Sequence, residues 1–263
     1  MAVRISASST YLVRTASVPG VTPFTWTMRM YLVSDRNAAG IIFDLVNGAG
    51  SVYQDVRLTS NGTTLEIRTN GANTAGSNLT VGQWYHLGYV RNGTSHTLYL
   101  DGTSVATLTS SISLTPAAFL VGSNTVSWTN ARYSDLGIWE AALDATAIAA
   151  ERDSHGQAAR TSDLWAYYRL GNDANDSSGN ARHLTETGAI AYEDGPPVSI
   201  TVTDTGAGAD AVTVTSDGGD ESISVSDIGS GSDALAGLAV AFGVGDSASG
   251  NDGFGARAAS LST

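Results

Sequence analysis

Residues 83–109, QWYHLGYVRNGTSHTLYLDGTSVATLT, contain three short stretches rich in apolar and aromatic residues, separated by two glycine-containing turns. The pairs Asn92-Gly93 and Asp101-Gly102 tolerate the positive φ angles that two-residue hairpin turns require. This segment therefore predicts three consecutive antiparallel strands.

The pairing register of these strands follows from counting outward from each turn. Two-residue turns place Tyr89 opposite His96 and Leu98 opposite Val105. Because side chains alternate along a strand, Tyr85, Leu87, Tyr89, Leu98, Leu100 and Val105 then share one face. The other face is half polar, so the pattern predicts an antiparallel sheet with one packed inner face.

Similar short stretches, bounded by Gly, Asn and Asp, continue along the chain, and Asn61-Gly62 predicts a third tight hairpin. One short helix is expected over 144–153, with Asp144 as its N-cap. The expected strands are 2–7, 23–33, 40–46, 52–58, 63–69, 84–91, 95–101, 103–109, 118–122, 132–140 and 164–170. Regular short strands of this kind are typical of an all-β antiparallel β-sandwich.

Several segments, in the expected order, resemble the laminin-G-like (concanavalin A-like) jelly-roll family. Residues 84–102 carry a Trp-aromatic-His opening and a Leu-Tyr-Leu-Asp-Gly hairpin, and PFTWTMRMYL (23–32) fits the opening strand. FLVG (119–122) and ARYSDLGIWEAALDATAIAAERD (131–153) resemble the later strands and the short helix. The resemblance covers roughly residues 1–195 and implies a jelly-roll sandwich. It implies less about activity, because this fold carries lectins, adhesins, enzymes and spacers.

Gly195-Pro196-Pro197 marks the expected domain boundary. Residues 1–195 are expected to form the sandwich, with 163–186 closing it beside the N-terminal strand; a truncated second repeat is the alternative. Residues 198–263 contain nine acidic residues and one basic residue, and account for −8 of the net charge of −12. They repeat an Asp-bounded turn, at 204–210, 227–233 and 246–252. This acidic Gly/Ser/Asp-rich segment is predicted to be a low-complexity β tail for oligomerisation or docking.

The composition argues against several classes of partner and chemistry. The chain has no cysteine and no lysine, so disulfides, a Walker A loop and lysine Schiff-base chemistry are excluded. The acidic charge argues against nucleic acid, and the longest apolar stretch, 234–244, is too short for membrane insertion. Residues 1–20 show no secretion signal. An extracellular type of fold without a signal indicates a phage or viral particle protein; a secreted protein with its signal removed is the alternative.

No arrangement of residues predicts catalysis. Asp44, Asp55 and Glu66 lie on separate strands, outside the i, i+2, i+5 pattern of sandwich glycoside hydrolases. The chain has no Gly-x-Ser-x-Gly elbow and no zinc-binding helix, and His86 and His96 are predicted to be packed strand residues. Neither a catalytic residue nor an enzymatic activity is therefore expected.

No cofactor is expected, but Ca²⁺ is an alternative that the sequence leaves open. The loops 34–40 and 171–180 are rich in the oxygen ligands that calcium prefers. Turns favour the same residues for backbone reasons alone, so no metal-binding residue is assigned.

Sugar recognition on a sandwich would use an aromatic side chain beside amide and charged groups on a loop or rim. The candidate ligand-binding residues are Trp128, Asn130, Arg132, Asn124 and Tyr53. The remaining tryptophans lie within strand patterns and are expected in the core, namely Trp26, Trp84, Trp139 and Trp165.

The sequence therefore predicts a non-enzymatic, surface-displayed binding or adhesion protein, a virion component of capsid or tail that recognises glycans or a host surface. It is expected on a virion or an extracellular surface. Expected partners are other copies of the chain or virion proteins, bound through 198–263, and cell-surface glycan. Two alternatives stay open: a purely structural decoration or fibre subunit without a ligand, and a secreted carbohydrate-binding module.

Overall fold

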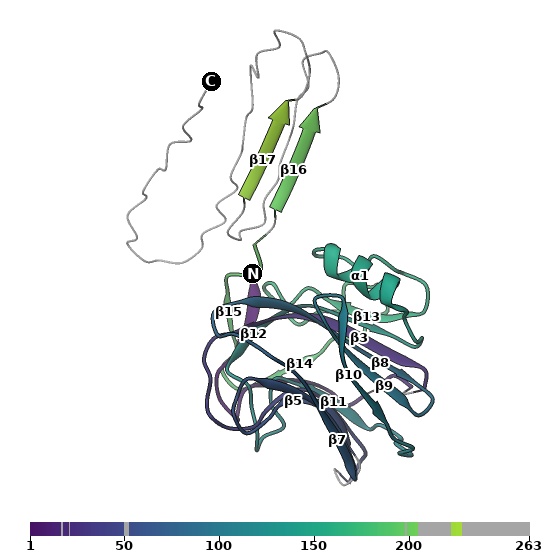
Figure 1. Ribbon diagram of the computed structural model, residues 1–263. Coiled ribbons are helices and arrows are strands. Elements are labelled where there is room, and N and C mark those ends of the chain that lie inside the picture. The colour runs from purple at the N-terminus through teal and green to yellow at the C-terminus, as the bar shows by residue number, and fades with distance from the viewer. Residues whose placement is uncertain (17, 21, 50–52, 198, 205–221, 228–263) are drawn as a thin grey trace.

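The computed structural model describes residues 1–16, 18–20, 22–49, 53–197, 199–204 and 222–227. Two antiparallel sheets, here called sheet A and sheet B, face each other, and one short helix lies on the outer side of sheet A (Figure 1). The inner faces of both sheets contribute to one hydrophobic core. The predicted all-β antiparallel sandwich with one short helix is thus confirmed.

Sheet A has the strand order β10-β9-β8-β3-β12-β1-β15, and β13 also pairs with β12. Its strands are β1 (Ala2–Ile5), β3 (Phe24–Leu32), β8 (Trp84–Asn92), β9 (Ser95–Leu100), β10 (Thr103–Thr109), β12 (Ala131–Trp139), β13 (Leu164–Tyr168) and β15 (Ala191–Glu193). β1 pairs with the first residues of β12 and β13 with its last residues. The predicted closing strand therefore pairs with β12, and the expectation that it lies beside the N-terminal strand is wrong.

Sheet B has the strand order β14-β2-β11-β4-β5-β6-β7. Its strands are β2 (Tyr11–Arg14), β4 (Gly40–Val46), β5 (Tyr53–Leu58), β6 (Thr64–Thr69), β7 (Ala72–Asn78), β11 (Ala118–Val121) and β14 (Thr185–Thr187). Four strands are absent from the set predicted from the sequence, namely β2, β7, β14 and β15. Three of them, β7, β14 and β15, are edge strands. β7 contains no large apolar residue, so it shows no apolar alternation, and the pair Asn70-Gly71 before it was the available turn signal.

The β8–β9 hairpin turns at Gly93 and Thr94, because Asn92 is already paired with Ser95. Gly93 supplies the positive φ of this turn, at 61°. Tyr89 consequently pairs with Leu98, and the predicted pairing with His96 is wrong. The error is two residues, which leaves every side chain on its predicted face.

The second hairpin turns at Asp101-Gly102 as predicted, since Leu100 pairs with Thr103. A bulge between Ser104 and Ala106 then shifts the register by one residue. Leu98 therefore lies opposite Ala106, and the predicted pairing with Val105 is wrong.

The core is organised around aromatic rings from both sheets. Trp26 stacks on Tyr89 within sheet A and on Phe43 of sheet B, with ring centroids 6.0 and 5.0 Å apart. Phe43 stacks in turn on Phe119 at 5.4 Å. These ring contacts stabilise the packing of the two sheets in addition to the stabilisation that apolar burial provides.

Trp26, Trp139 and Trp165 are buried as predicted, as are His86 and His96. Trp84 is half-buried and packs against Tyr31, with ring centroids 5.5 Å apart. Both residues alternate with core residues of their strands, so they lie on the outer face of sheet A. The prediction that Trp84 belongs to the core is therefore wrong.

The helix α1 (Ala145–Asp153) begins where the sequence predicts. The Asp144 side chain accepts a hydrogen bond from the backbone N–H of Ala147 at 2.8 Å. Ile148 is buried against Val90 and Trp139, which closes a small second core on the outer face of sheet A. No helix in the described part of the chain has the length and apolar character needed to cross a membrane.

The described part of the C-terminal segment consists of β16 (Ser199–Asp204) and β17 (Ser222–Asp227). They pair in parallel, in register from Ser199 and Ser222 to Asp204 and Asp227. Most of the repeated Asp-bounded turns lie outside the described residues. The domain boundary and the role of 198–263 stay predictions.

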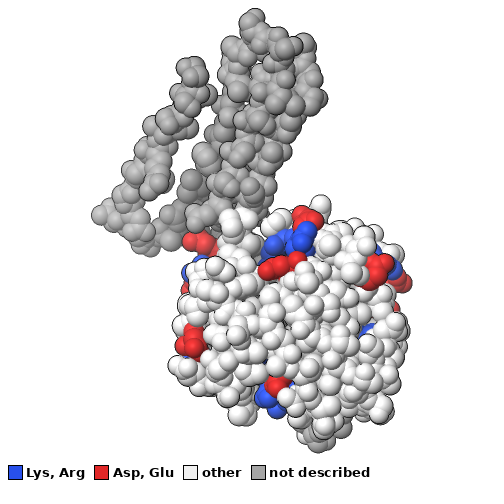
Figure 2. Space-filling view, in the orientation of Figure 1, with Lys and Arg blue, Asp and Glu red and all other residues white. Residues whose placement is uncertain are grey.

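Charged side chains are sparse on the face of the sandwich in Figure 2, and acidic and basic groups adjoin one another there. The described residues contain these ion pairs: Arg4–Glu193, Arg29–Asp135, Arg57–Glu66, Arg68–Asp55, Arg132–Glu193, Arg152–Asp153 and Arg160–Asp163. Local pairing therefore compensates much of the charge on the sandwich.

The substitution Tyr89→Phe tests the buried hairpin contact. The Tyr89 hydroxyl and His96 Nδ1 form a buried hydrogen bond of 2.5 Å, so its loss leaves the imidazole nitrogen without a partner. We expect a loss of about 1–3 kcal/mol in the free energy of unfolding, measured by chemical denaturation. The control Tyr85→Phe removes an exposed hydroxyl that contacts Thr80 and Gln83, and water replaces it at a cost of about 0.5 kcal/mol. Equal losses in the two variants would contradict the assignment.

Candidate functional site

Trp128, predicted to bind ligand, lies half-buried in the loop between β11 and β12. The Arg36 guanidinium lies 3.6 Å from the centroid of its indole ring and also donates a hydrogen bond to the Trp128 carbonyl. One face of the ring is therefore covered by a side chain of the same protein.

The other four predicted residues fall into two groups. Asn130 accepts a hydrogen bond from Arg4 at 2.6 Å, and Arg4 is the cross-strand partner of Arg132. Asn130 and Arg132 therefore adjoin at one end of sheet A.

The second group contacts sheet B. Asn124 donates to Asp44 of sheet B at 3.3 Å. Tyr53 is also on sheet B, with the Arg68 guanidinium 4.4 Å from its ring centroid. The contacts of the five side chains thus divide between the two sheets, and their role in binding stays a prediction.

Three carboxylates that the sequence distributes over separate strands come together on sheet B. Asp44 of β4 is the cross-strand partner of Asp55 of β5, and Asp55 faces Arg68 of β6. Arg68 donates to Asp55 from Nε at 3.0 Å and from Nη2 at 2.5 Å, while Glu66 pairs with Arg57 at 2.5 Å. These side chains alternate with core residues, so they form a polar row on the outer face of the sheet.

Asp44 and Asp55 are only 2% and 1% exposed, and the Oδ1 atom of each has no hydrogen-bond partner within the described structure. Burial, followed by the neighbouring Asp55 charge, raises the pKa of Asp44 to about 7. Burial also raises the pKa of Asp55, against the opposing effect of Arg68. At this depth the pair is closed to a substrate, so it acts on stability rather than on chemistry.

The oxygen-rich loops considered for calcium use their carboxylates to hold their own turns. Asp35 accepts the N–H of Asn37 at 2.6 Å, and Asp173 accepts that of Asn175 at 3.0 Å. Among the described residues no group of three or more His, Asp or Glu side chains is placed to hold a metal ion. Calcium binding stays untested.

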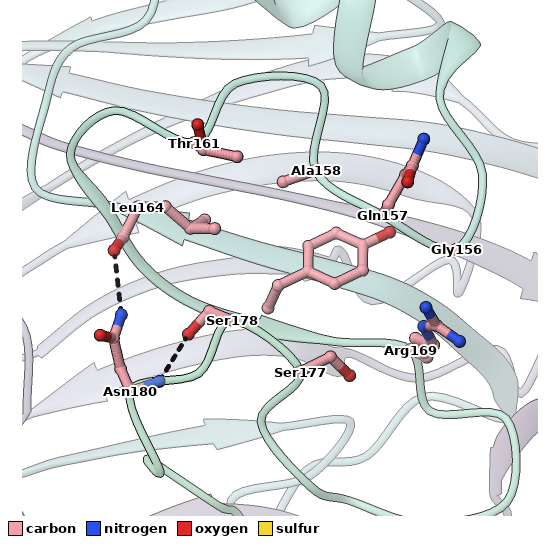
Figure 3. Close-up of a pocket in the computed structure, with 10 residues that line it drawn as sticks. Gly156, Gln157, Ala158, Thr161, Leu164, Arg169, Ser177, Ser178 and Asn180 are labelled. Carbon is pink, nitrogen blue, oxygen red and sulfur yellow. Dashed lines mark hydrogen bonds between the residues drawn. The ribbon is translucent and has the colours of Figure 1, made fainter.

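A pocket that the sequence analysis missed lies on the outer face of sheet A beside β13 (Figure 3). Its volume is about 410 Å³, within the range of small-molecule sites. One wall is the loop that follows α1, the other is the loop after β13, and β13 itself provides the floor. Its lining residues are Gly156, Gln157, Ala158, Thr161, Leu164, Tyr167, Arg169, Ser177, Ser178 and Asn180.

Two carboxylates, the half-buried Asp135 and the buried Glu151, hold the first wall of this pocket. Asp135 of β12 accepts hydrogen bonds from the N–H of Gly156 at 3.1 Å and from the Tyr167 hydroxyl at 3.0 Å. Glu151 of α1 accepts the N–H groups of Ala159 and Arg160 at 3.1 and 2.7 Å. Burial raises the pKa of Glu151, and these two hydrogen bonds act against that shift. The loop is therefore fixed by contacts to the sheet and to the helix.

Asp176 holds the opposite wall. It accepts the backbone N–H groups of Tyr167, Ser178 and Arg182 at 2.9–3.1 Å. Burial favours the neutral carboxyl, but the hydrogen bonds outweigh it and lower the pKa of Asp176. The Asn180 amide donates to the Leu164 carbonyl, which ties the end of this loop back to β13 (Figure 3). Hydrogen bonds within the protein thus hold the backbone of both walls in place, so the pocket is preorganised for a ligand.

The chemistry of the lining suits a polyhydroxylated ligand. The lining combines the hydroxyl groups of Thr161, Ser177 and Ser178 and the carboxamide of Gln157 with the aromatic ring of Tyr167. Such groups donate and accept hydrogen bonds, while the ring and Leu164 offer apolar surface. One signal of this pocket is present in the sequence, namely the polar loop at 171–180, and turn propensity explains that loop equally well.

The fold and the pocket define a jelly-roll β-sandwich protein with a polar surface pocket. The chain belongs to the concanavalin A-like lectin/glucanase superfamily, since the Laminin_G_3 model of that superfamily matches residues 6–149. This confirms the resemblance that the strand motifs indicate. A comparison with curated proteins finds no match.

Solved structures with the same fold include a protein of Bacteroides ovatus ATCC 8483 provisionally named as carbohydrate-binding. It is 16% identical with a TM-score of 0.56, over 74% of this chain and 61% of that one. The heptameric SAP-like pentraxin of Limulus polyphemus is 17% identical with a TM-score of 0.54, over 72% of this chain and 93% of that one. This chain therefore spans about three fifths of the Bacteroides protein. At these identities the similarity establishes the fold.

The substitution Asp44→Asn tests the buried carboxylate pair through the pH dependence of stability. The folded state keeps a proton on Asp44 up to about pH 7, whereas an unfolded Asp releases it near pH 4. The folded state thus binds more protons between these values, and stability falls as pH rises, by at most about 1.4 kcal/mol per pH unit. We expect Asp44→Asn to make this fall smaller, measured by denaturation from pH 4 to pH 8; the part that remains comes from Asp55 and Glu151, whose pKa burial also raises.

The control for this test is Asp163→Asn, which changes an exposed carboxylate paired with Arg160. It should leave the pH profile of the wild-type protein unchanged. An unchanged profile in Asp44→Asn would show that Asp44 ionises near its ordinary value.

Proposed function

We propose that this protein is a non-enzymatic binding protein that recognises carbohydrate through the pocket beside β13. The observation that carries the proposal is the combination of fixed walls, a volume of about 410 Å³ and a lining of hydroxyl and amide groups around an aromatic ring. Membership of a superfamily that includes lectins supports it, as does the similarity of fold to a protein provisionally named as carbohydrate-binding.

The carboxylates around the pocket favour binding over hydrolysis. Cleavage of a glycosidic bond requires a carboxylic acid and a second carboxylate free to act on opposite sides of the bond. Asp135 is paired with Arg29 at 3.4 Å, and Glu151 and Asp176 accept backbone N–H groups. These acids support the walls, so none is available as a general acid or a nucleophile.

The proposal includes display on a surface. The sequence predicts a virion or an extracellular surface, with 198–263 joining copies of the chain or attaching them to other virion proteins. The parallel, in-register pairing of β16 and β17 is consistent with a tail that forms β-structure. Two alternatives predicted from the sequence differ from this proposal. The purely structural subunit has no ligand, and the carbohydrate-binding module is secreted and does not belong to a virion.

Glycan-array binding tests the ligand and separates the two candidate sites. We expect the full-length protein to bind a subset of glycans, and Ser177→Trp to reduce that signal at least tenfold, because the indole occupies the pocket. Ser60→Trp, at an exposed serine in the β5–β6 turn, should leave binding unchanged. Loss in Trp128→Ala with retention in Ser177→Trp would place the site at the loop predicted from sequence. Absence of binding to every glycan would favour the structural subunit.

Deletion of 198–263 tests the role of the tail. Every core residue that the structure describes lies before residue 198, so we expect the shortened protein to stay folded. We expect its mass in solution to fall to that of a monomer, measured by light scattering, while the full-length chain is oligomeric. An unchanged oligomeric state after deletion would assign assembly to the sandwich.

A further inference from the structure

We infer that the pocket beside β13 selects an acidic saccharide, one that carries a carboxylate or a sulfate, and that Arg169 binds this acidic group. The inference rests on the proposed function and specifies its ligand class. It starts from the charge of the pocket lining, in which Arg169 is the one ionic residue.

Arg169 directly follows β13, and its backbone is fixed beside the pocket. Its carbonyl accepts the N–H of Asp135 at 3.1 Å. The side chain is exposed, and its guanidinium lies at the same end of the pocket as Gln157 and Gly156 in Figure 3. An acidic group entering that end meets the guanidinium without any rearrangement of the chain.

The guanidinium of Arg169 has no partner within the described structure, and this separates it from the other arginines there. Seven of them form ion pairs with Asp or Glu. The rest donate hydrogen bonds to carbonyl or amide oxygens, namely Arg14, Arg36, Arg91 and Arg182. Arg169 is thus the described arginine whose five N–H donors are left to a ligand.

The neighbouring carboxylates do not neutralise this charge. Asp135 is paired with Arg29, and Glu151 is bonded to backbone N–H groups of the first wall. Asp176 is turned toward the N–H groups of Tyr167, Ser178 and Arg182. The pocket therefore has a local positive charge that its surroundings leave uncompensated.

A guanidinium binds a carboxylate or a sulfate through two parallel N–H···O bonds, which a neutral sugar cannot form. The net charge of −12 repels a highly charged polyanion at longer range. The remaining lining, with Ser177, Ser178 and Gln157, offers hydrogen bonds to sugar hydroxyls. A saccharide with an isolated acidic group satisfies both parts of the pocket.

The test is an array of uronate-containing, sialylated, sulfated and neutral glycans, probed with the full-length protein at about 0.15 M salt. We expect binding to acidic glycans, at least a tenfold loss in Arg169→Gln, and a smaller loss in Arg169→Lys, which keeps the charge but not the planar donor pair. The matched control Arg152→Gln removes an exposed arginine of α1 outside the pocket and should bind like wild type.

Binding confined to neutral glycans would overturn the inference and leave the proposed function standing. Acidic-glycan binding that is unchanged in Arg169→Gln, or equally weakened in Arg152→Gln, would also overturn it. A protein that binds no glycan of either kind would overturn the inference and the proposed function together.

Discussion

The structure depends on one column of aromatic side chains that joins the two sheets. Tyr89 and Trp26 come from sheet A, and Phe43 and Phe119 from sheet B. Trp165 of β13 completes the column with an edge-on contact to Phe119, at 6.1 Å between ring centroids. Ala166 and Tyr168 of the same strand also lie in this core, so Tyr167 between them points to the outer face of sheet A.

β12 pairs with two successive strands, with β1 over its first residues and with β13 over its last residues. Tyr167 lies opposite Gly137 of β12, and its hydroxyl reaches Asp135 on the outer face. Gly137 is required there, because a Cβ atom would lie 2.3 Å from the Trp139 ring. The packing that anchors β13 in the core therefore also places the floor of the pocket. The pocket and a core contact share one strand.

Buried and half-buried carboxylates accept hydrogen bonds from irregular backbone in the sandwich. Asp135, Glu151 and Asp176 each accept N–H groups of a loop that no strand could satisfy. Asp44 and Asp55 differ, since they face each other on neighbouring strands, each has one oxygen without a hydrogen-bond partner, and burial raises the pKa of both. Carboxylates thus hold loop backbone at the pocket walls, whereas on the outer face of sheet B they lie side by side in a buried row.

The sequence by itself determined the features that neighbouring residues control. Turn pairs located the hairpins, alternation assigned Tyr85, Leu87 and Leu98 to one face, and Asp144 marked the start of the helix, because each depends on residues a few positions apart. Only the tertiary structure decided the register beyond Gly93, the meeting of Asp44 with Asp55, and the cover that Arg36 gives Trp128. The pocket was also decided by the tertiary structure. Its walls are two loops held by Glu151 and Asp176, and they meet at β13. Contacts between distant segments depend on how the sheets pack, and no local pattern in the chain records them.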